Sequence, residues 1–210
     1  VDKRAIFQDA TDFKYFLESL HLFNDTHFVK WTRPLQRILS LSMSERFDFE
    51  REHYIDVVAY TLIPNHYHLL VRQLKDGGIS RLMHKLDMAF SHVFNKRNNR
   101  SGTLFEGEFK AVHVSDETHL VHLPVYIHLN ILDLADFQWR EGEVKDWDEA
   151  IRFMGAYPWS SHGAYLGKKQ YLPIVRRETI QDFYKDEQEY LAHLKGWSTR
   201  SIQDHLAKLS

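Results

Sequence analysis

The sequence predicts a domain of the α+β class, in which helices flank a central antiparallel sheet. Two observations predict it. Apolar residues at three- and four-residue spacing, typical of amphipathic helices, lie on both sides of two neighbouring stretches rich in β-branched and aromatic residues. Only a tight turn separates these two strand-like stretches, which indicates an antiparallel pair. The chain of 210 residues is long enough to bury a core.

The N-terminal part begins with an amphipathic helix predicted over residues 11–23, with Thr11 or Asp12 near its start as the cap. Pro34 is a predicted start for a short helix through Leu41, because proline suits the first turn of a helix. Residues 42–52 are polar and predict a connector.

The two strands are predicted over residues 54–62 and 66–74, with the Pro64-Asn65 pair as the turn between them. The Asp76-Gly77-Gly78 stretch ends the second strand. The apolar residues that follow keep a helical period, which predicts a helix over residues 79–94.

Beyond this helix, residues 96–102 predict a basic, turn-rich loop, and residues 103–114 predict one bent strand or two short ones. A helix capped by Ser115 or Asp116 is expected to run to about Leu132. Residues 133–150 are acidic and predict a surface loop leading into another helix. The tail from residue 178 to residue 209 also has a helical pattern. We expect a main domain over residues 1–150 and a C-terminal helical appendage over residues 151–210.

The composition excludes several classes of protein. A formal net charge of −2 argues against a purely electrostatic nucleic-acid binder, although a local basic surface is compatible with it. The absence of cysteine excludes disulfides, thiolate zinc sites and cysteine nucleophiles. A bound metal would therefore need imidazole and oxygen ligands. The absence of a membrane-span or signal-peptide pattern makes a cytoplasmic location the expectation.

Two histidines form the first candidate site. His66 and His68 flank Tyr67 on a predicted strand, so both imidazoles point to one face and can bind one divalent metal. Taken alone, this spacing favours two solvent-exposed histidines on an open sheet face, since it arises easily by chance among 14 histidines.

The helix predicted up to Leu132 adds a second set of polar residues. Tyr126 and Asn130 are four residues apart and share a helix face, with His122 one turn earlier. Beside the histidine pair, they would supply a nucleophile and a third metal ligand. The alternative is a tyrosine with a buried ring and a wet hydroxyl, and the spacing alone does not decide between them.

A resemblance extends over several such motifs in consistent order. AYTLIPNHYHLLVRQ (59–73) resembles the "A-Y-x-x-M-P-N-H-x-H-L-L" signature of the HUH-type single-tyrosine transposases. Within them, the chain most resembles the branch of REP-associated tyrosine transposases. GGISRLMHKL (77–86) and FNKRNNRSGTLFEGEFKAVHV (94–114) are similar to that family's next region. YIHLN (126–130) and YPWSSHGAYLG (157–167) are similar to its nucleophile helix and to a downstream motif.

The resemblance implies a ferredoxin-like (RRM-like) core and a metal-dependent transposase. It implies that His66, His68 and Asn130 bind Mg²⁺ or Mn²⁺, and that Tyr126 is the nucleophile that forms a 5′-phosphotyrosine. The expected partner is single-stranded DNA with hairpins from palindromic repeats, bound by a nucleoid-associated monomer or homodimer.

Basic residues between positions 72 and 110 are the candidates for contacts to DNA phosphates. They are Arg72, Lys75, Arg81, Lys85, Lys96, Arg97, Arg100 and Lys110. The alternative for each is an ordinary solvated side chain, and we expect about half of them to contact DNA.

Some positions depart from the family pattern. Pro124 should kink or restart the helix that carries Tyr126. Asp133 stands where the family usually has arginine and Glu108 where it often has arginine, and together with the acidic residues 133–149 this would weaken DNA affinity or shift specificity. The family's first strand is missing or lies upstream of Val1. These departures leave open a DNA-binding relative without catalysis. A non-covalent metal-dependent hydrolase is a further alternative, less favoured because no carboxylate-rich ligand set accompanies the histidines.

Overall fold

The protein is described by a computed structural model over residues 4–26, 51–105, 107, 109–115 and 117–197. It is α+β, as predicted, with a two-stranded sheet and helices before and after it in the chain. The chain forms two compact units, each built from separate segments. Unit 1 contains the described residues of Val1–Phe7, Val57–Val71 and Phe109–Ser210. Unit 2 contains those of Gln8–Asp56 and Arg72–Glu108.

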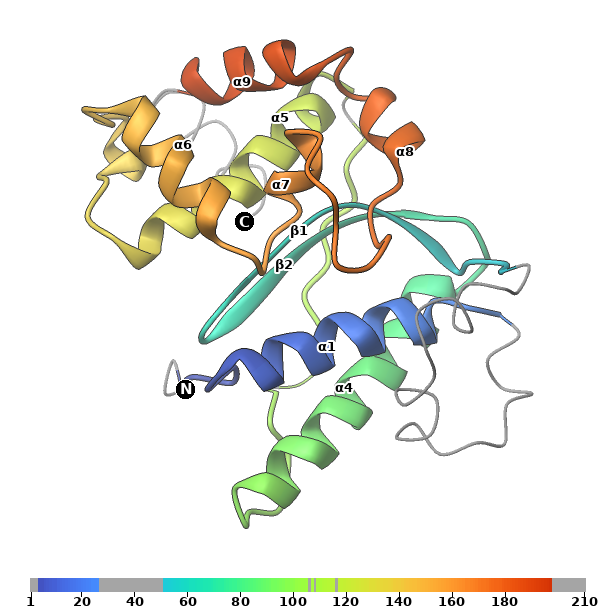
Figure 1. The fold of residues 1–210 in the computed structure, drawn as a ribbon. Coiled ribbons are helices and arrows are strands. Elements are labelled where there is room, and N and C mark those ends of the chain that lie inside the picture. Colours follow the sequence, from blue (N-terminus) through green and yellow to red (C-terminus); the bar gives the residue numbers. More distant parts are fainter. Residues whose placement is uncertain (1–3, 27–50, 106, 108, 116, 198–210) are drawn as a thin grey trace. The chain divides into compact units, whose positions relative to one another are not determined.

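The sheet is a hairpin of β1 (Ile55–Ile63) and β2 (His66–Gln73), which confirms both predicted strands (Figure 1). Every residue of β1 is buried, in line with its mostly apolar and β-branched sequence, and this includes the polar residues Asp56 and Thr61. The turn is held by the backbone N–H groups of Ile6 and Phe7, which donate to the Pro64 carbonyl at 2.7 and 2.9 Å.

The free edge of β1 is covered by residues 159–161. Thr61 forms an isolated antiparallel bridge with Ser160, and the Leu62 N–H donates to the Trp159 carbonyl at 2.9 Å. An uncovered strand edge would leave backbone groups unpaired, and this short segment pairs those of Tyr60 and Leu62 near the end of β1.

Unit 2 pairs α1 (Ala10–Phe23) with α4 (Gly78–Arg97), which lie side by side (Figure 1). The rings of Phe16 and Phe90 meet edge to face, with centroids 5.5 Å apart. The cap of α1 is Asp9, whose carboxylate accepts from the N–H groups of the first turn, so the prediction of Thr11 or Asp12 is wrong.

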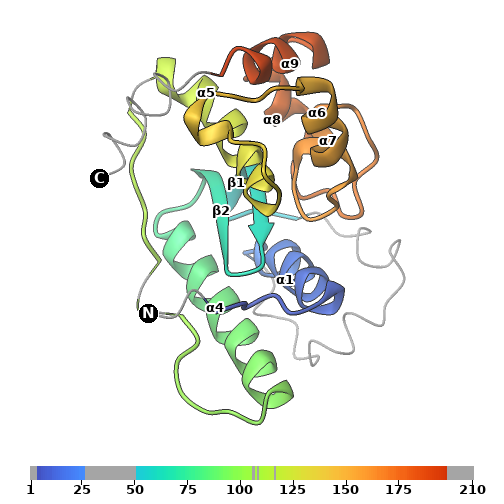
Figure 2. The same cartoon turned by 90° about the vertical axis from the view of Figure 1, so that its left-hand side faces the viewer.

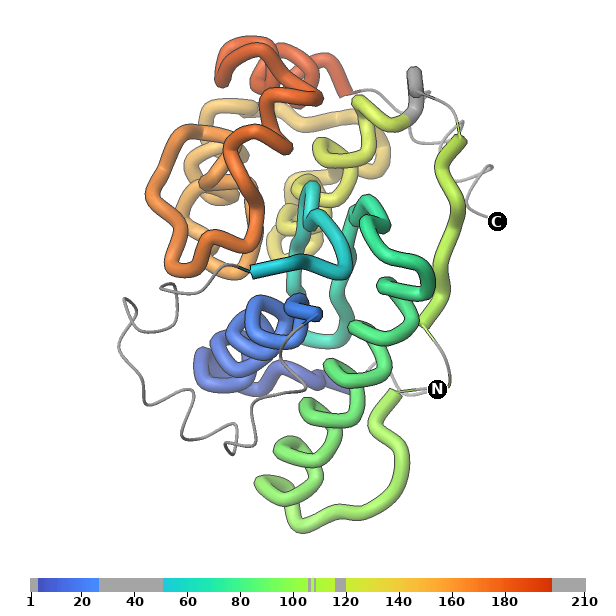
Figure 3. The backbone as a smooth tube through the Cα atoms, turned by 90° about the vertical axis from the view of Figure 1, so that its right-hand side faces the viewer, coloured from blue at the N-terminus to red at the C-terminus, as the bar shows by residue number. Residues whose placement is uncertain are grey.

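Two local predictions next to α4 are also wrong. Lys96 and Arg97 belong to the last turn of α4 and not to a loop, since basic side chains are favourable at a helix C-terminus. The described residues between 103 and 114 form no strand, and Figure 3 shows 109–115 as an extended stretch. Val112 is exposed there. Alternating polarity is therefore not sufficient for a strand without a pairing partner.

Unit 1 holds the remaining helices, which gather around α5 (Figure 2). They are α5 (Glu117–Leu129), η2 (Asn130–Leu134), η3 (Trp139–Glu141), α6 (Trp147–Ala156), α7 (His162–Tyr165), α8 (Arg177–Gln181) and α9 (Glu187–Lys195). Helix α5 is continuous through Pro124, so the expected restart does not occur, and the α-helix ends at Leu129.

The acidic segment is more ordered than a surface loop, because it contains η2, η3 and the start of α6, and because Trp139 is buried. The described residues of the expected appendage (151–210), which end at residue 197, fall in the same compact unit as those of 109–150. The helix predicted through Leu41, the connector up to residue 50 and the tail beyond residue 197 lie outside the described residues.

Candidate active site

The two histidines of β2 converge at one point in unit 1. The Nε2 atoms of His66 and His68 lie 3.0 Å apart. The Nδ1 atom of His66 is 2.8 Å from Oδ1 of Asn65. Because an amide oxygen only accepts, Nδ1 of His66 donates, and this leaves the Nε2 lone pair directed at the neighbouring imidazole. Asn65 is thus the kind of outer partner that fixes the tautomer of a metal-binding histidine.

This geometry fits a divalent metal. Two ligand atoms at about 2.1 Å from an octahedral ion, and at right angles, lie roughly 3.0 Å from each other. No group of three or more histidine and carboxylate side chains in the described part of the chain is arranged to hold a metal. The remaining ligands would have to come from an amide oxygen, water or substrate.

The neighbourhood keeps both imidazoles neutral, which is the form that binds metals. Burial lowers the pKa of His68 to about 4, with further contributions from His66 and the positive charge of Arg140. The pKa of His66 is also lowered, because neighbouring side chains exclude water, although the Asp133 carboxylate opposes the shift.

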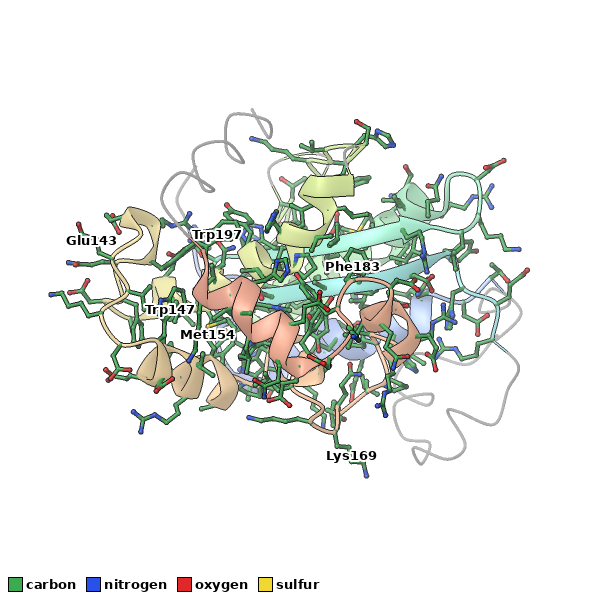
Figure 4. The ribbon with its side chains drawn as sticks, turned by 90° about the horizontal axis from the view of Figure 1, so that it is seen from above. Glu143, Trp147, Met154, Lys169, Phe183 and Trp197 are labelled. Atoms are coloured by element: carbon green, nitrogen blue, oxygen red, sulfur yellow. The ribbon has the colours of Figure 1, made fainter. Side chains whose placement is uncertain are left out.

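Tyr126 lies beside this pair on α5. Its ring is buried, with its centroid 6.3 Å from that of His68. Two indole rings enclose it, those of Trp139 at 5.9 Å and Trp197 at 6.0 Å between centroids. Trp197 is labelled in Figure 4, beyond the last turn of α9. These contacts hold the phenol ring in one place, as a nucleophile requires.

Asn130 follows one turn after Tyr126 and is fully buried. Its Nδ2 donates to the Tyr126 carbonyl at 2.7 Å, which directs Oδ1 away from the helix end. Oδ1 accepts from Nη2 of Arg140 at 3.0 Å. A carbonyl oxygen has two lone pairs, so Oδ1 retains acceptor capacity for a second partner.

Sequence reasoning missed Arg140 and Asp133 as site residues. The Arg140 Nε and Nη2 atoms donate to the two carboxylate oxygens of Asp133 at 3.0 and 2.5 Å. The effect of Asp133 on DNA affinity or specificity stays a prediction, and in the structure its carboxylate holds the Arg140 guanidinium beside Asn130. No pattern in the sequence predicts that Asp133 and Arg140, seven residues apart in an acidic segment, form an ion pair.

The candidate DNA-contacting residues fall into distinct environments. Four of them bind other parts of unit 2 through ion pairs or hydrogen bonds: Arg72, Lys75, Arg97 and Arg100. The Lys85 ammonium is buried over the Tyr54 ring, 4.9 Å from its centroid. Within the described ranges, no hydrogen bond or ion pair engages the side chains of Arg81, Lys96 and Lys110.

Comparison with known proteins identifies the family. A model of the family described as "Transposase IS200 like" matches residues 26–130, a range that contains both histidines and ends at Asn130. The chain belongs to the IS200-like transposases. This transposase is therefore an enzyme that cleaves DNA, and the His66, His68 and Tyr126 cluster lies within the matched range.

No curated protein and no solved structure matches the chain. Among the helices that the structure describes, none is long and apolar enough to cross a membrane.

Proposed function

We propose that this transposase cleaves and rejoins single-stranded DNA that carries hairpins, through a covalent 5′-phosphotyrosine at Tyr126. The observation that carries the proposal is the convergence of His66 and His68 Nε2 atoms 3.0 Å apart, with the Tyr126 ring next to His68. A nucleophile adjacent to two neutral imidazoles is the arrangement that metal-assisted phosphoryl transfer needs.

In the first step, the Tyr126 oxygen attacks the scissile phosphorus, and the bond from phosphorus to the 3′-oxygen breaks. The phenol proton is lost, and the leaving oxygen takes up a proton to become a 3′-hydroxyl. Mg²⁺ or Mn²⁺, held by His66, His68 and the Asn130 oxygen, would stabilise negative charge on the phosphate oxygens. Attack by another 3′-hydroxyl reverses the reaction, so the energy of the phosphodiester is conserved.

The finer assignments are part of the same proposal. We propose that the chain belongs to the REP-associated branch, which its motifs resemble most and whose DNA carries palindromic hairpins. We also propose a monomer or homodimer that acts at the nucleoid. Phosphate contacts would come first from Arg81, Lys96 and Lys110, because no interaction within the described chain engages their side chains.

The test is to incubate the protein with end-labelled hairpin-bearing single-stranded DNA and Mn²⁺ or Mg²⁺. We expect a denaturant-resistant protein–DNA adduct that requires the metal and disappears on addition of EDTA. Tyr126→Phe should abolish the adduct, because the nucleophilic oxygen is gone. His66→Ala should lower its yield by about a hundredfold, because metal binding is lost.

Tyr171→Phe and His113→Ala are the matched controls, since both residues are exposed and lie outside the site. Both should form adduct at the wild-type level. Cleavage that survives Tyr126→Phe would exclude the covalent reaction and favour a metal-dependent hydrolase. Binding without cleavage, over a set of hairpin sequences, would instead favour a DNA-binding relative that has lost catalysis.

A further inference from the structure

Arg140 has an unusual set of partners for a residue of an acidic segment. Beside its two contacts with Asp133, it donates to the buried Asn130 oxygen at 3.0 Å. The Trp139 ring on which the guanidinium lies is also the ring that packs against Tyr126, with centroids 5.9 Å apart. One cation therefore contacts the proposed amide ligand and lies beside the ring that holds the proposed nucleophile.

The guanidinium is fixed in this position. Its central carbon lies 4.3 Å from the centroid of the Trp139 ring, a cation–π distance. The Trp139 indole nitrogen donates to Asp133 at 2.7 Å, so the ring and the carboxylate that hold Arg140 also hold each other. The Arg140 side chain is still 39% exposed, and its partner carboxylate is 29% exposed. A fixed cation with an exposed side can bind an anion without rearrangement.

The charge of the guanidinium is maintained. An arginine side chain stays protonated in proteins, and the Asp133 carboxylate pairs with it here. The Asp133 carboxylate compensates the positive charge of the Arg140 guanidinium and accepts from two of its five N–H groups.

Resting on the proposed function, we infer that Arg140 is a catalytic residue that binds the phosphate attacked by Tyr126, and that Asp133 positions it. A nucleophilic oxygen must come within about 3.5 Å of phosphorus before attack. A guanidinium held beside Asn130, one helical turn after Tyr126, is then close to the non-bridging oxygens of the phosphate. N–H groups on the exposed side of the fixed guanidinium can donate to the phosphate when DNA binds.

The step balances without a further reactant. The Tyr126 oxygen forms the new bond to phosphorus while the bond to the 3′-oxygen breaks. Negative charge increases on the non-bridging oxygens during the attack, and Arg140 neutralises part of it. The guanidinium remains protonated throughout, so the proton exchange concerns only the phenol and the leaving 3′-oxygen.

The test measures the rate of adduct formation at saturating hairpin DNA, and separately the affinity for the same DNA in EDTA. Arg140→Ala should lower the rate by about a hundredfold, because one donor to the transition-state charge is removed. Arg140→Lys should recover part of it, since lysine keeps the charge but not the planar fork. The affinity should change by less than about threefold, since most affinity comes from other phosphates.

Guanidinium ion added at low millimolar concentration should restore adduct formation in Arg140→Ala but not in Tyr126→Phe. Arg152→Ala is the control, because Arg152 is an exposed arginine of α6 bonded to the Asp148 carbonyl. Thermal unfolding of each variant shows whether it is folded. If Arg140→Ala does not fold, Arg140→Gln replaces it with the same readouts.

The two proposals fail in different ways. Absence of any adduct with the wild-type protein would overturn the proposed function. Wild-type adduct formation with an unchanged rate in Arg140→Ala would overturn only the role of Arg140. A slow Arg140→Ala variant that guanidinium does not restore, while Arg140→Lys is equally slow and less stable, would make Arg140 a structural residue and also overturn the inference.

Discussion

At the scale of single residues, the charged side chains of unit 2 separate into those that stabilise the fold and those that are available to DNA. Arg72 shows the first kind. Its Nε and Nη2 atoms donate to Oδ2 of Asp56 at 3.2 and 2.8 Å, and Asp56 is buried within β1. A buried carboxylate needs a compensating charge, so the guanidinium of Arg72 has a structural task. Arg81 on α4 shows the second kind, because it is exposed.

Arg72→Ala should lower the free energy of unfolding by about 2 kcal/mol, because it removes the charged partner of the buried Asp56 carboxylate. Urea unfolding at neutral pH measures this. Arg81→Ala is the matched control and should change the free energy by less than about 0.5 kcal/mol.

For DNA affinity, Arg81→Ala should have a larger effect than Arg72→Ala. Arg81→Ala should reduce the dependence of DNA affinity on salt concentration by about one unit of logarithmic slope, as expected for one lost phosphate contact. A stable Arg72→Ala variant with a reduced salt slope would show that Arg72 contacts DNA and that its pairing with Asp56 is dispensable.

At the scale of elements, the position of α5 depends on a buried hydrogen-bond network next to the active site. His128 lies on α5 two residues after Tyr126, and its Nε2 is 2.7 Å from Oγ of Ser161. That oxygen also accepts from the Tyr60 N–H of β1 at 2.9 Å. On its other side, Nδ1 of His128 is 2.9 Å from the Tyr190 hydroxyl of α9. The helix that carries Tyr126 is thus joined to β1, the strand before the histidine pair.

Ser161→Ala should destabilise the protein by about 2 kcal/mol, because it leaves the buried Tyr60 N–H and the His128 imidazole without this oxygen. The midpoint of thermal unfolding measures the loss. Ser80→Ala is the control on an exposed position of α4 and should leave the midpoint nearly unchanged. An unchanged midpoint for Ser161→Ala would mean that packing alone holds α5 on the hairpin.

At the scale of the whole molecule, buried histidines make stability depend on pH. His162 is buried, and this burial, with the charge of Lys168, lowers its pKa to about 3. The pKa of His128 is also lowered well below 6.5, first by burial and then by His162. Both remain neutral in the folded protein below pH 6.5, whereas the unfolded chain takes up protons there. The stabilisation is therefore complete above about pH 6.5 and decreases as the pH falls.

Between pH 7.5 and pH 5, the free energy of unfolding should fall by about 2 kcal/mol through His162, and the lowered pKa of His128 should make it fall further. Urea unfolding in EDTA at both pH values measures the difference. His162→Asn keeps a polar atom near the position of Nδ1, which is 2.6 Å from the Tyr190 hydroxyl. It should remove the part of the fall in unfolding free energy that comes from His162. His84→Asn, at an exposed site, should keep the full dependence, and an equal effect of both variants would contradict the assignment.

The local patterns of the sequence were sufficient for the main elements. Helical period predicted α1 and α4, and stretches rich in β-branched and aromatic residues predicted β1 and β2, each to within a few residues. Alternation also predicted that His66 and His68 share one side of β2, which the 3.0 Å separation of their Nε2 atoms confirms. The strand expected between residues 103 and 114 was wrong because a strand also needs a partner, which alternation does not reveal.

The sequence by itself determined the α+β class, the histidine pair and the helix that carries Tyr126, since these depend on neighbours a few residues apart. Only the tertiary structure decided what surrounds them. Arg140 reaches Asn130 through a pair of short helical turns, and Ser161 reaches His128 from 33 residues away. In such contacts, buried polar groups form hydrogen bonds with residues that only the fold brings near them. No periodic pattern in the sequence predicts which residues these are.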